Sequence, residues 1–367
     1  MDASWVEIDT GLIRDNLRAA QHYLEPGARF CAVLKADAYG HGISVVLPEL
    51  MKEGVDFIGI TSNDEARSAR SCGYIGRIIR LRAAHISEAK AVLSCQVEEL
   101  VGSTESARSL SALGRQSGKR TPVHLILNVN GMGREGIELS QEAGRQSCLE
   151  ILRNTGLQIV GMMTHFPSNT SDDLAESRTQ FLAQVNWIFE NSNLVRDQVI
   201  VHAGSSLTLM AGATAGFDMV RCGAVLYGIV GPRDRFKSTL MLKSRVTEIS
   251  SYQKHSTVGY DRSYRLERDS RLANVSIGYA NGYRRVFAGH GVALISGKRL
   301  PVLGKISMNS LVVDVTDLPE TQIGDTVVLF GSQAGACVDI AEVEAQSQTI
   351  LADLYVDWGR SNARKIG

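Results

Sequence analysis

The sequence predicts a (β/α)8 barrel followed by a smaller, mostly antiparallel β domain. The chain has 367 residues, too many for one ordinary domain of about 150 residues, and a barrel accounts for about 200–250 of them. From about residue 30 to residue 225, short apolar runs alternate with helical patterns, whereas later β-type runs follow one another through short turns. We therefore expect the barrel over residues 10–230 and the β domain over residues 231–367, with a strand from residues 1–9 joining the β domain.

Eight apolar runs of strand length lie in the first part of the chain, separated by segments with helical periodicity. Parallel strands need a helical crossover between them, so this alternation favours a closed barrel. An open doubly wound sheet is the alternative, but no GxGxxG turn follows the first strand. The expected strands are Phe30–Ala36, Asp56–Thr61, Arg77–Arg82, Val97–Gly102, Val123–Val129, Gln158–Thr164, Gln198–Ala203 and Phe217–Cys222. The expected helices include Ser44–Gly54, Asp64–Cys72, Thr104–Ser117 and Asp173–Asn191.

The last third of the chain has the pattern of antiparallel strands joined by tight turns such as Ser296-Gly297-Lys298. One helix is expected near the end, over Ile340–Ala352. The expected strands are Leu240–Tyr252, Arg271–Ile277, Val292–Ile295, Leu300–Ile306, Leu311–Val315 and Thr326–Phe330.

Composition and charge exclude several classes of protein. Hydrophobic residues at 44% and charged residues at 21% are typical of a globular chain rather than a disordered one. Thirty-nine basic and thirty-nine acidic side chains leave no net charge to attract nucleic acid or an anionic membrane. No apolar run reaches the roughly 18–20 residues that span a bilayer.

The six cysteines form no CxxC pair and no zinc-type spacing with histidine, so no metal site is expected. Because the acidic start is unlike a secretory leader, we expect a cytoplasmic protein, or a periplasmic one if a leader has been removed.

Polar side chains stand where several of the expected barrel strands end. Lys35 ends the first strand, and Arg134, His165, His202 and Arg221 follow or end the fifth to eighth strands. Barrel enzymes place their catalytic groups at this end of the strands, and partial burial there lowers the pKa of a lysine. Taken singly, each group has a plain structural alternative, such as a lysine that only lies along the surface. Five such groups on one rim indicate a single site.

Small residues follow the seventh and eighth strands, in His202-Ala-Gly-Ser-Ser206 and Arg221-Cys-Gly223. Turns of this kind bind phosphate through backbone N–H groups, and barrels often carry a phosphate site there. A lysine and a phosphate site on one rim indicate pyridoxal phosphate as cofactor.

The segment Lys35-Ala-Asp-Ala-Tyr-Gly-His-Gly resembles the lysine motif of the alanine racemase family, and the similarity runs through nearly the whole chain. The family's C-terminal motifs follow in order as Val258-Gly-Tyr260-Asp, Ile277-Gly-Tyr279-Ala-Asn-Gly-Tyr283 and Gly304-Lys-Ile-Ser-Met308-Asn309. The broad-specificity amino acid racemases are more similar still, because they carry Leu-Asn before the Gly-Met-x-Arg turn, as in Leu127-Asn128, and Lys-x-Ser-Met-Asn, as in Lys305–Asn309. Their ending resembles Leu351–Arg364.

This resemblance implies a homodimer with shared active sites, pyridoxal phosphate as cofactor and free amino acids as substrates. It implies that Lys35 binds the cofactor covalently and acts as one base, and that Tyr260 of the partner subunit is the opposite base. It implies that Arg221 donates to the pyridine nitrogen with support from His202. The implied phosphate ligands are Tyr39, Ser206, Gly223 and Ala224. The implied substrate contacts are Arg134 and the backbone of Met308 from the partner subunit, with His165 bonded to Tyr260 and Tyr279 lining the channel.

The implied roles agree with the chemistry of racemisation. A planar carbanion needs a base on each face, and a lysine and a tyrosine supply one each. An arginine at the pyridine nitrogen keeps its own proton, so the ring withdraws fewer electrons and side reactions such as transamination are discouraged. A decarboxylase of the same fold would be expected to carry a carboxylate there, so Arg221 favours a racemase.

The chain departs from the alanine-specific members beside the substrate arginine. Those members carry a lysine that becomes carbamylated, where this chain has Leu127, and an aspartate where it has Asn309. Asn128 or a bound anion is then expected to position Arg134.

Two further departures bear on the entrance and on the cysteines. The entrance tyrosine of the alanine-specific members aligns near Arg360, and Tyr355, close by, is the candidate phosphate ligand there. The disulfide of many broad-specificity relatives would join Cys31 to the position of Phe57, so Cys31 is expected to be free.

Together these features predict a racemase that acts on several amino acids through an entrance that admits substrates longer than alanine. An alanine-specific racemase is the nearest alternative. A non-catalytic pyridoxal-phosphate carrier built on the barrel alone is a second, but it would need neither Tyr260 nor a β domain.

Overall fold

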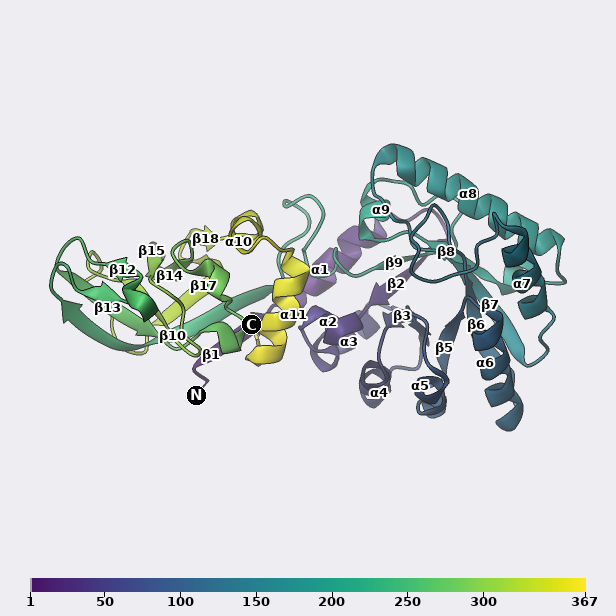
Figure 1. Ribbon diagram of the computed structural model, residues 1–367, viewed down its shortest axis with the longest axis horizontal. Helices are drawn as coiled ribbons and strands as arrows, with labels where there is room; N and C mark the ends of the chain where they lie inside the picture. Colours follow the sequence, from purple (N-terminus) through teal and green to yellow (C-terminus); the bar gives the residue numbers. More distant parts are fainter. Residues whose placement is uncertain (1) are drawn as a thin grey trace. The chain divides into compact units, whose positions relative to one another are not determined.

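The structure, a computed structural model, describes residues 2–367. The chain forms two compact units (Figure 1). The larger unit, Arg14–Ala38 with Val46–Phe236, is the barrel, and the smaller unit combines the residues up to Ile13, Tyr39–Val45 and Lys237–Gly367. The predicted fold class, a parallel barrel followed by a mostly antiparallel β region, is confirmed. No helix among the described residues is both long enough and apolar enough to cross a bilayer.

Eight parallel strands close the barrel in the order β2 to β9, with β9 pairing back onto β2. All eight predicted strands are present, with small shifts at their ends. Their residues are almost all buried, as expected for a parallel sheet that is covered on both faces. The strands are β2 Arg29–Val33, β3 Phe57–Ile60, β4 Arg77–Arg80, β5 Val97–Val101, β6 Thr121–Ile126, β7 Leu157–Met163, β8 Ile200–Ala203 and β9 Met219–Cys222.

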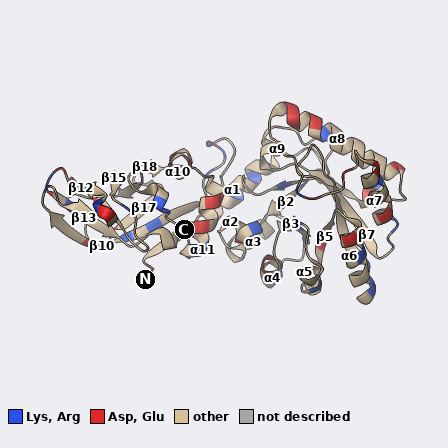
Figure 2. Ribbon diagram, in the orientation of Figure 1, with Lys and Arg blue, Asp and Glu red and all other residues tan. Residues whose placement is uncertain are grey.

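Helices surround these strands (Figure 1). Polar caps fix where several of them begin: Ser62 and Glu65 form a reciprocal capping box at α4, and Ser103 and Thr170 cap α6 and α8. Residues of both charge signs lie along α6 and α7 (Figure 2). The four predicted helices are α3, α4, α6 and α8. The segment labelled α2, Lys35–Tyr39, is a left-handed turn, and the helices of this part of the chain are α1 Thr10–Gln21, α3 Ile43–Lys52, α4 Asn63–Ser71, α5 Ile86–Lys90, α6 Thr104–Gln116, α7 Glu142–Leu152, α8 Ser171–Glu190 and α9 Ser206–Met210.

The smaller unit contains a nine-stranded sheet in the order β18-β17-β14-β15-β16-β13-β10-β1-β19. The long strand β10 pairs with β1, β13 and β17, so it links the two ends of the sheet. All six predicted strands are present. The strands are β1 Ser4–Ile8, β10 Leu240–Tyr252, β13 Ser270–Val275, β14 Val292–Ile295, β15 Lys298–Leu303, β16 Leu311–Asp314, β17 Thr326–Gln333, β18 Ala336–Val338 and β19 Ala363–Ile366, with the separate pair β11 Thr257–Val258 and β12 Tyr264–Arg265.

The prediction of one helix over Ile340–Ala352 is wrong, because the chain forms two helices there. α10 covers Ile340–Ser347 and α11 covers Leu351–Ser361. Gln348 adopts a left-handed conformation (φ 54°) and its N–H bonds to the Glu344 carbonyl, which ends the first helix. The apolar pattern continues across this break, which explains why periodicity alone does not reveal it.

Candidate active site

The turn after Lys35 is left-handed. β2 ends at Val33, and Ala36, Asp37, Ala38 and Tyr39 have φ values of 54°, 55°, 56° and 53°. This conformation costs roughly 1–2 kcal/mol for each residue with a side chain, so the surrounding structure has to hold it. Such strain is found mostly at functional sites.

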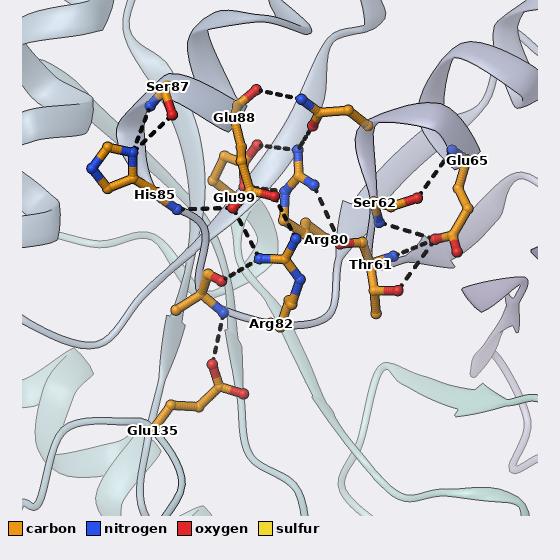
Figure 3. A network of polar contacts seen from close by, with 12 residues as sticks. Thr61, Ser62, Glu65, Arg80, Arg82, His85, Ser87, Glu88, Glu99 and Glu135 are labelled. Atoms are coloured by element: carbon orange, nitrogen blue, oxygen red, sulfur yellow. Dashed lines mark hydrogen bonds and ion pairs between the residues drawn. The ribbon is translucent and has the colours of Figure 1, made fainter. Parts of the chain in front are cut away.

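A carboxylate on the neighbouring strand-helix turn helps to hold this conformation. Glu65 accepts hydrogen bonds from the backbone N–H groups of Thr61 and Ser62 (2.7 and 3.0 Å), and its other oxygen accepts from the Asp37 N–H (3.3 Å). Figure 3 shows Glu65 directed at Thr61 and Ser62. The N-terminal cap of α4 therefore also supports the turn that carries Lys35.

Lys35 has a perturbed amine. Its side chain reaches solvent in the single chain, yet its pKa lies below the ordinary value. Partial burial of the ammonium at the rim is the main cause, and the cations Arg134 and Arg221 add to it. A lowered pKa makes the neutral, nucleophilic form of the amine more accessible near neutral pH.

A buried ion pair continues the rim on the next strands. Arg80, at the end of β4, is fully buried and pairs with Glu99 of β5 through its Nε (2.8 Å) and Nη2 (3.2 Å). Nη2 also donates to the Asn63 side-chain oxygen (2.8 Å), and Asn63 in turn donates to the Glu88 carbonyl (3.1 Å). Figure 3 shows this network, in which Arg80 lies between Glu99 and the start of α4.

Arg134 lies beside a carboxylate that the sequence analysis did not single out. The Arg134 Nε donates to Glu135 Oε1 (3.2 Å), and the other oxygen of Glu135 accepts from the Ala83 N–H (2.7 Å), a contact drawn in Figure 3. Asn128 donates to Glu138 (2.8 Å) and accepts from the Gly133 N–H (3.0 Å), so it shapes the turn that carries Arg134. In the described part of the chain, the carboxylate in contact with the Arg134 guanidinium is Glu135.

Arg221 is buried and held by protein acceptors. Nη1 donates to His202 Nδ1 and to the His202 carbonyl (both 3.0 Å), and Nη2 donates to the Thr164 carbonyl (2.7 Å). Among the described residues no hydrogen bond is made by Nε, which leaves that N–H for a ligand. Burial lowers the pKa of Arg221 to about 10, so the guanidinium remains charged at neutral pH.

His165 belongs to the same cluster. Burial, together with the nearby cations Arg221, Arg134 and Lys35, lowers the pKa of His165 to about 4. The structure therefore brings together Lys35, Arg134, His165 and Arg221, which are widely separated in the sequence.

Two polar residues inside the barrel were missed by the sequence analysis. His124 of β6 lies between His202 (2.8 Å) and Glu98 of β5 (2.7 Å), and both histidines are fully buried. The available signal was a charged and an imidazole side chain within apolar strand runs, where a polar group needs a partner.

The turns after β8 and β9 are in contact with each other. Ser206, buried at the start of α9, accepts a hydrogen bond from the Val225 N–H (3.3 Å), next to Gly223 and Ala224. Gly223 is buried and Ala224 is partly exposed.

The three C-terminal motifs lie together on the smaller unit. The Ala280 N–H bonds to the Met308 carbonyl (2.9 Å) and the Tyr279 N–H to the Ser307 carbonyl (3.1 Å). The Tyr260 loop is held against the same segment, since Lys305 forms an ion pair with Asp261. Three side chains of these motifs are exposed in the single chain: Tyr260 by 64%, Tyr279 by 40% and Met308 by 55%. Asn309 is exposed beside them.

Tyr355 and Tyr39 have different surroundings within the smaller unit. Tyr355 is fully buried, and its ring packs edge-on against His41, with 5.1 Å between the ring centroids. It also packs against Phe330 and Trp358, with centroid distances of 5.8 and 6.2 Å. Its carbonyl lies where a Cβ on Gly40 would be, so the glycine of the lysine motif is needed for this contact. The structure thus gives Tyr355 a packing role in the core. Tyr39, at the end of the left-handed turn, is half-buried.

Cys31 is buried and unpaired, and it lies opposite Phe57 in the register of β2 and β3.

Comparison with known proteins identifies two successive family domains in the chain. The family model for the alanine racemase N-terminal domain matches residues 8–230, and that for the alanine racemase C-terminal domain matches residues 239–366. The chain belongs to the alanine racemase family. The N-terminal match contains the whole rim from Lys35 to Ala224, and the C-terminal match contains Tyr260, Tyr279 and Met308.

Individual members of the family differ in their substrates. A broad specificity amino-acid racemase of Pseudomonas putida is 44% identical over 98% of this chain and 88% of its own length. A lysine racemase of Proteus mirabilis is 38% identical over 99% of this chain and 89% of its own length. The solved alanine racemase of Bartonella henselae, with covalently bound pyridoxal phosphate, has the same fold, with a TM-score of 0.84, 24% identity and full coverage of both chains.

Proposed function

We propose that this protein is a homodimeric, pyridoxal-phosphate-dependent racemase of free amino acids with a broad substrate range. The observation that carries the proposal is the rim cluster: a lysine with a lowered pKa lies near a buried, charged arginine whose Nε–H makes no bond to the described residues. Membership of the alanine racemase family supports the same reading.

The rim residues fit pyridoxal phosphate. The amine of Lys35 suits the aldehyde, the Nε–H of Arg221 suits an unprotonated pyridine nitrogen, and the paired turns of Ser206, Gly223 and Ala224 suit the phosphate. Tyr39 is a further candidate for the phosphate. When bound, the cofactor withdraws electrons from the α-carbon of the amino acid and so makes its α-proton acidic.

Two bases move the α-proton. Lys35 serves one face of the substrate, where its lowered pKa lets the neutral amine accept a proton. Tyr260 of the partner subunit serves the other face. This assignment is supported by the exposure of Tyr260 in the single chain and by the anchoring of its loop through Asp261 and Lys305.

Arg221 holds its own proton during the reaction. Because its pKa of about 10 keeps it charged at neutral pH, it donates a hydrogen bond to the ring nitrogen without protonating it. An arginine that keeps its own proton would leave the ring nitrogen unprotonated, and this would favour return of the α-proton over side reactions.

Arg134 binds the substrate carboxylate, with the backbone of Met308 from the partner subunit. Glu135 orients Arg134 at one end and is itself fixed by the Ala83 N–H at the other. In this chain Glu135 therefore supplies the carboxylate that positions Arg134, in place of the carbamylated lysine of the alanine-specific members. Asn128 shapes the turn that carries Arg134 by accepting a hydrogen bond from the Gly133 N–H. Tyr279 and Asn309, near Met308, line the path of the side chain of the substrate.

Broad range is favoured over alanine specificity by the relatives, which include broad-specificity amino-acid racemases and a lysine racemase.

A racemisation screen tests the proposal. The purified protein, with pyridoxal phosphate, is incubated with each common L-amino acid and the D-isomer is measured by chiral chromatography, with Lys35→Ala as the matched control. We expect D-isomers from several amino acids, including basic ones, and none from the control. Turnover of alanine alone would contradict the broad range, and a colourless protein inactive on every amino acid would contradict the racemase assignment.

A further inference from the structure

A line of polar groups, all buried except the partly exposed Arg77, crosses the barrel and ends at Arg221. It runs from Arg77 at the start of β4 to Glu98 of β5, His124 of β6 and His202 of β8. The distances are 2.5 Å from Arg77 Nε to Glu98 Oε1, 2.7 Å from Glu98 Oε2 to His124 Nε2, 2.8 Å from His124 Nδ1 to His202 Nε2, and 3.0 Å from His202 Nδ1 to Arg221 Nη1. Barrel interiors are normally filled by apolar layers, so a polar line here requires a reason.

The chemistry of the two ends fixes the direction of every hydrogen bond. An arginine only donates, so His202 Nδ1 accepts from Arg221 and the proton of a neutral His202 lies on Nε2. His202 then donates to His124 Nδ1, and the proton of His124 lies on Nε2. At the far end Glu98, a carboxylate, accepts that proton. The sequence of donors and acceptors closes without a clash.

Neutral imidazoles are required throughout. A second proton on His202 would place an N–H against the Arg221 N–H. A second proton on His124 would force His202 Nε2 to accept a hydrogen bond, so the proton of His202 would move to Nδ1 and again face the Arg221 N–H. Burial lowers the pKa of both histidines below the ordinary value, in agreement with this requirement. For Glu98 burial opposes ionisation, but the hydrogen bonds from His124 and Arg77 outweigh it and its pKa is lowered.

We propose that Glu98 is a positioning residue for Arg221, which it holds through His124 and His202 in the single hydrogen-bonding arrangement that leaves the Nε–H for a ligand. This inference rests on the proposed function only in identifying that ligand as the pyridine nitrogen of pyridoxal phosphate. The chain of hydrogen bonds from Glu98 through His124 and His202 to Arg221, called the relay below, does not itself depend on the cofactor.

Gly161 of β7 makes room for the relay. A Cβ at this position would overlap His124 Nδ1, the atom that accepts from His202. The backbone of Gly161 is not in the left-handed region, so alanine is tolerated there by the backbone itself. Gly161→Ala is therefore a variant that keeps every polar group and displaces the His124 ring from its contacts with His202 and Glu98.

The first experiment reads the proton positions directly. Full-length protein is labelled with ¹⁵N in the histidine rings, and long-range ¹H–¹⁵N spectra are recorded, with His124→Gln and His202→Gln used for assignment. We expect both rings to be neutral with the proton on Nε2. A charged ring, or a proton on Nδ1 of either, would overturn the relay whether or not the protein binds pyridoxal phosphate.

The second experiment tests whether the relay acts on Arg221. Glu98→Gln keeps the shape and removes the charge, and Glu99→Gln is the matched control, because Glu99 is the neighbouring buried carboxylate of β5 and pairs with Arg80 instead. For Glu98→Gln and Gly161→Ala we expect altered ring ¹⁵N shifts of His124 and His202 and a shifted visible band of bound pyridoxal phosphate. We also expect kcat to fall about 10–100-fold with little change in KM, by analogy with the loss of carboxylates that orient metal-bound imidazoles. Glu99→Gln should leave the ring shifts and the band in place.

The outcomes separate the two claims. Unchanged ring shifts in Glu98→Gln, or a cofactor band equally shifted in Glu99→Gln, would overturn the positioning role. If Glu98→Gln does not fold, Gly161→Ala tests the relay at His124 instead, because it leaves Glu98 charged and displaces the imidazole. If the wild-type protein binds no pyridoxal phosphate, the proposed function fails, whereas the ring protons still decide the relay.

Discussion

Tyr260→Phe separates the two bases. The substitution removes one hydroxyl from a side chain that is 64% exposed in the single chain and makes no side-chain hydrogen bond to the described residues. We therefore expect the free energy of unfolding to change by less than about 0.5 kcal/mol. Racemisation should fall by about 10²–10⁴-fold, the usual contribution of one positioned acid or base, which corresponds to about 2.7–5.4 kcal/mol of activation free energy.

The isotope pattern is more informative than the rate. We assign the α-proton of the L-isomer to Tyr260 and that of the D-isomer to Lys35. With the phenol removed, Lys35 still takes and returns the proton of the D-isomer, so deuterium from heavy water should enter the D-isomer without inversion. The L-isomer should stay almost unlabelled.

Proton NMR of each enantiomer, incubated with the variant in heavy water, measures both rates from the decay of the α-proton signal. Wild-type protein is the control, and thermal unfolding of the variant confirms that its fold is intact. Equal loss of the signal from both enantiomers would show that one base reaches both faces, and the two-base assignment would be refuted.

Three further predictions concern Lys35 and the dimer. Lys35→Ala should lose racemisation and the visible band of the lysine-linked cofactor, and a retained band would mean that another amine binds it. Mixing Lys35→Ala with Tyr260→Phe subunits should restore up to about a quarter of the wild-type activity, because random reassortment gives half heterodimers with one complete site each; no recovery after demonstrated subunit exchange would refute the shared site. In the cofactor-free protein the pKa of Lys35 is lowered from its unfolded value of 10.5. Between these two pKa values Lys35 binds more protons in the unfolded chain than in the folded one. The free energy of unfolding therefore rises with pH over this range. Lys35→Met should remove this rise in urea titrations between neutral pH and about 10.5, and an unchanged slope would contradict the lowered pKa.

The barrel was predictable because its strands are short apolar runs bounded by turns, and each of the eight appears at its predicted place. The ends of the helices were harder to predict from the sequence. The break at Gln348 depends on one residue with positive φ, and nothing in the apolar pattern marks it. The left-handed turn after Lys35 could not be predicted either, because none of Ala36, Asp37 and Ala38 is a glycine, the residue that usually indicates positive φ.

Several residues of the site could be named from strand ends, because a barrel brings the carboxyl ends of all its strands to one rim. Lys35, Arg134, His165 and Arg221 were predicted in this way, and they lie close enough together that the cations lower the pKa of Lys35 and of His165. Glu135 was missed because a glutamate next to an arginine has no distinguishing pattern in sequence.

What the sequence determined by itself is the alternation of strands and helices and the chemistry at the strand ends, since both are properties of local segments. The tertiary structure alone decided which buried groups meet. His124 and His202 are 78 positions apart and Glu98 is 26 positions from His124, yet closure of the barrel joins them in one line to Arg221. The directions of these hydrogen bonds follow from an arginine at one end and a carboxylate at the other, and only folding brings those two ends within reach of the same pair of imidazoles.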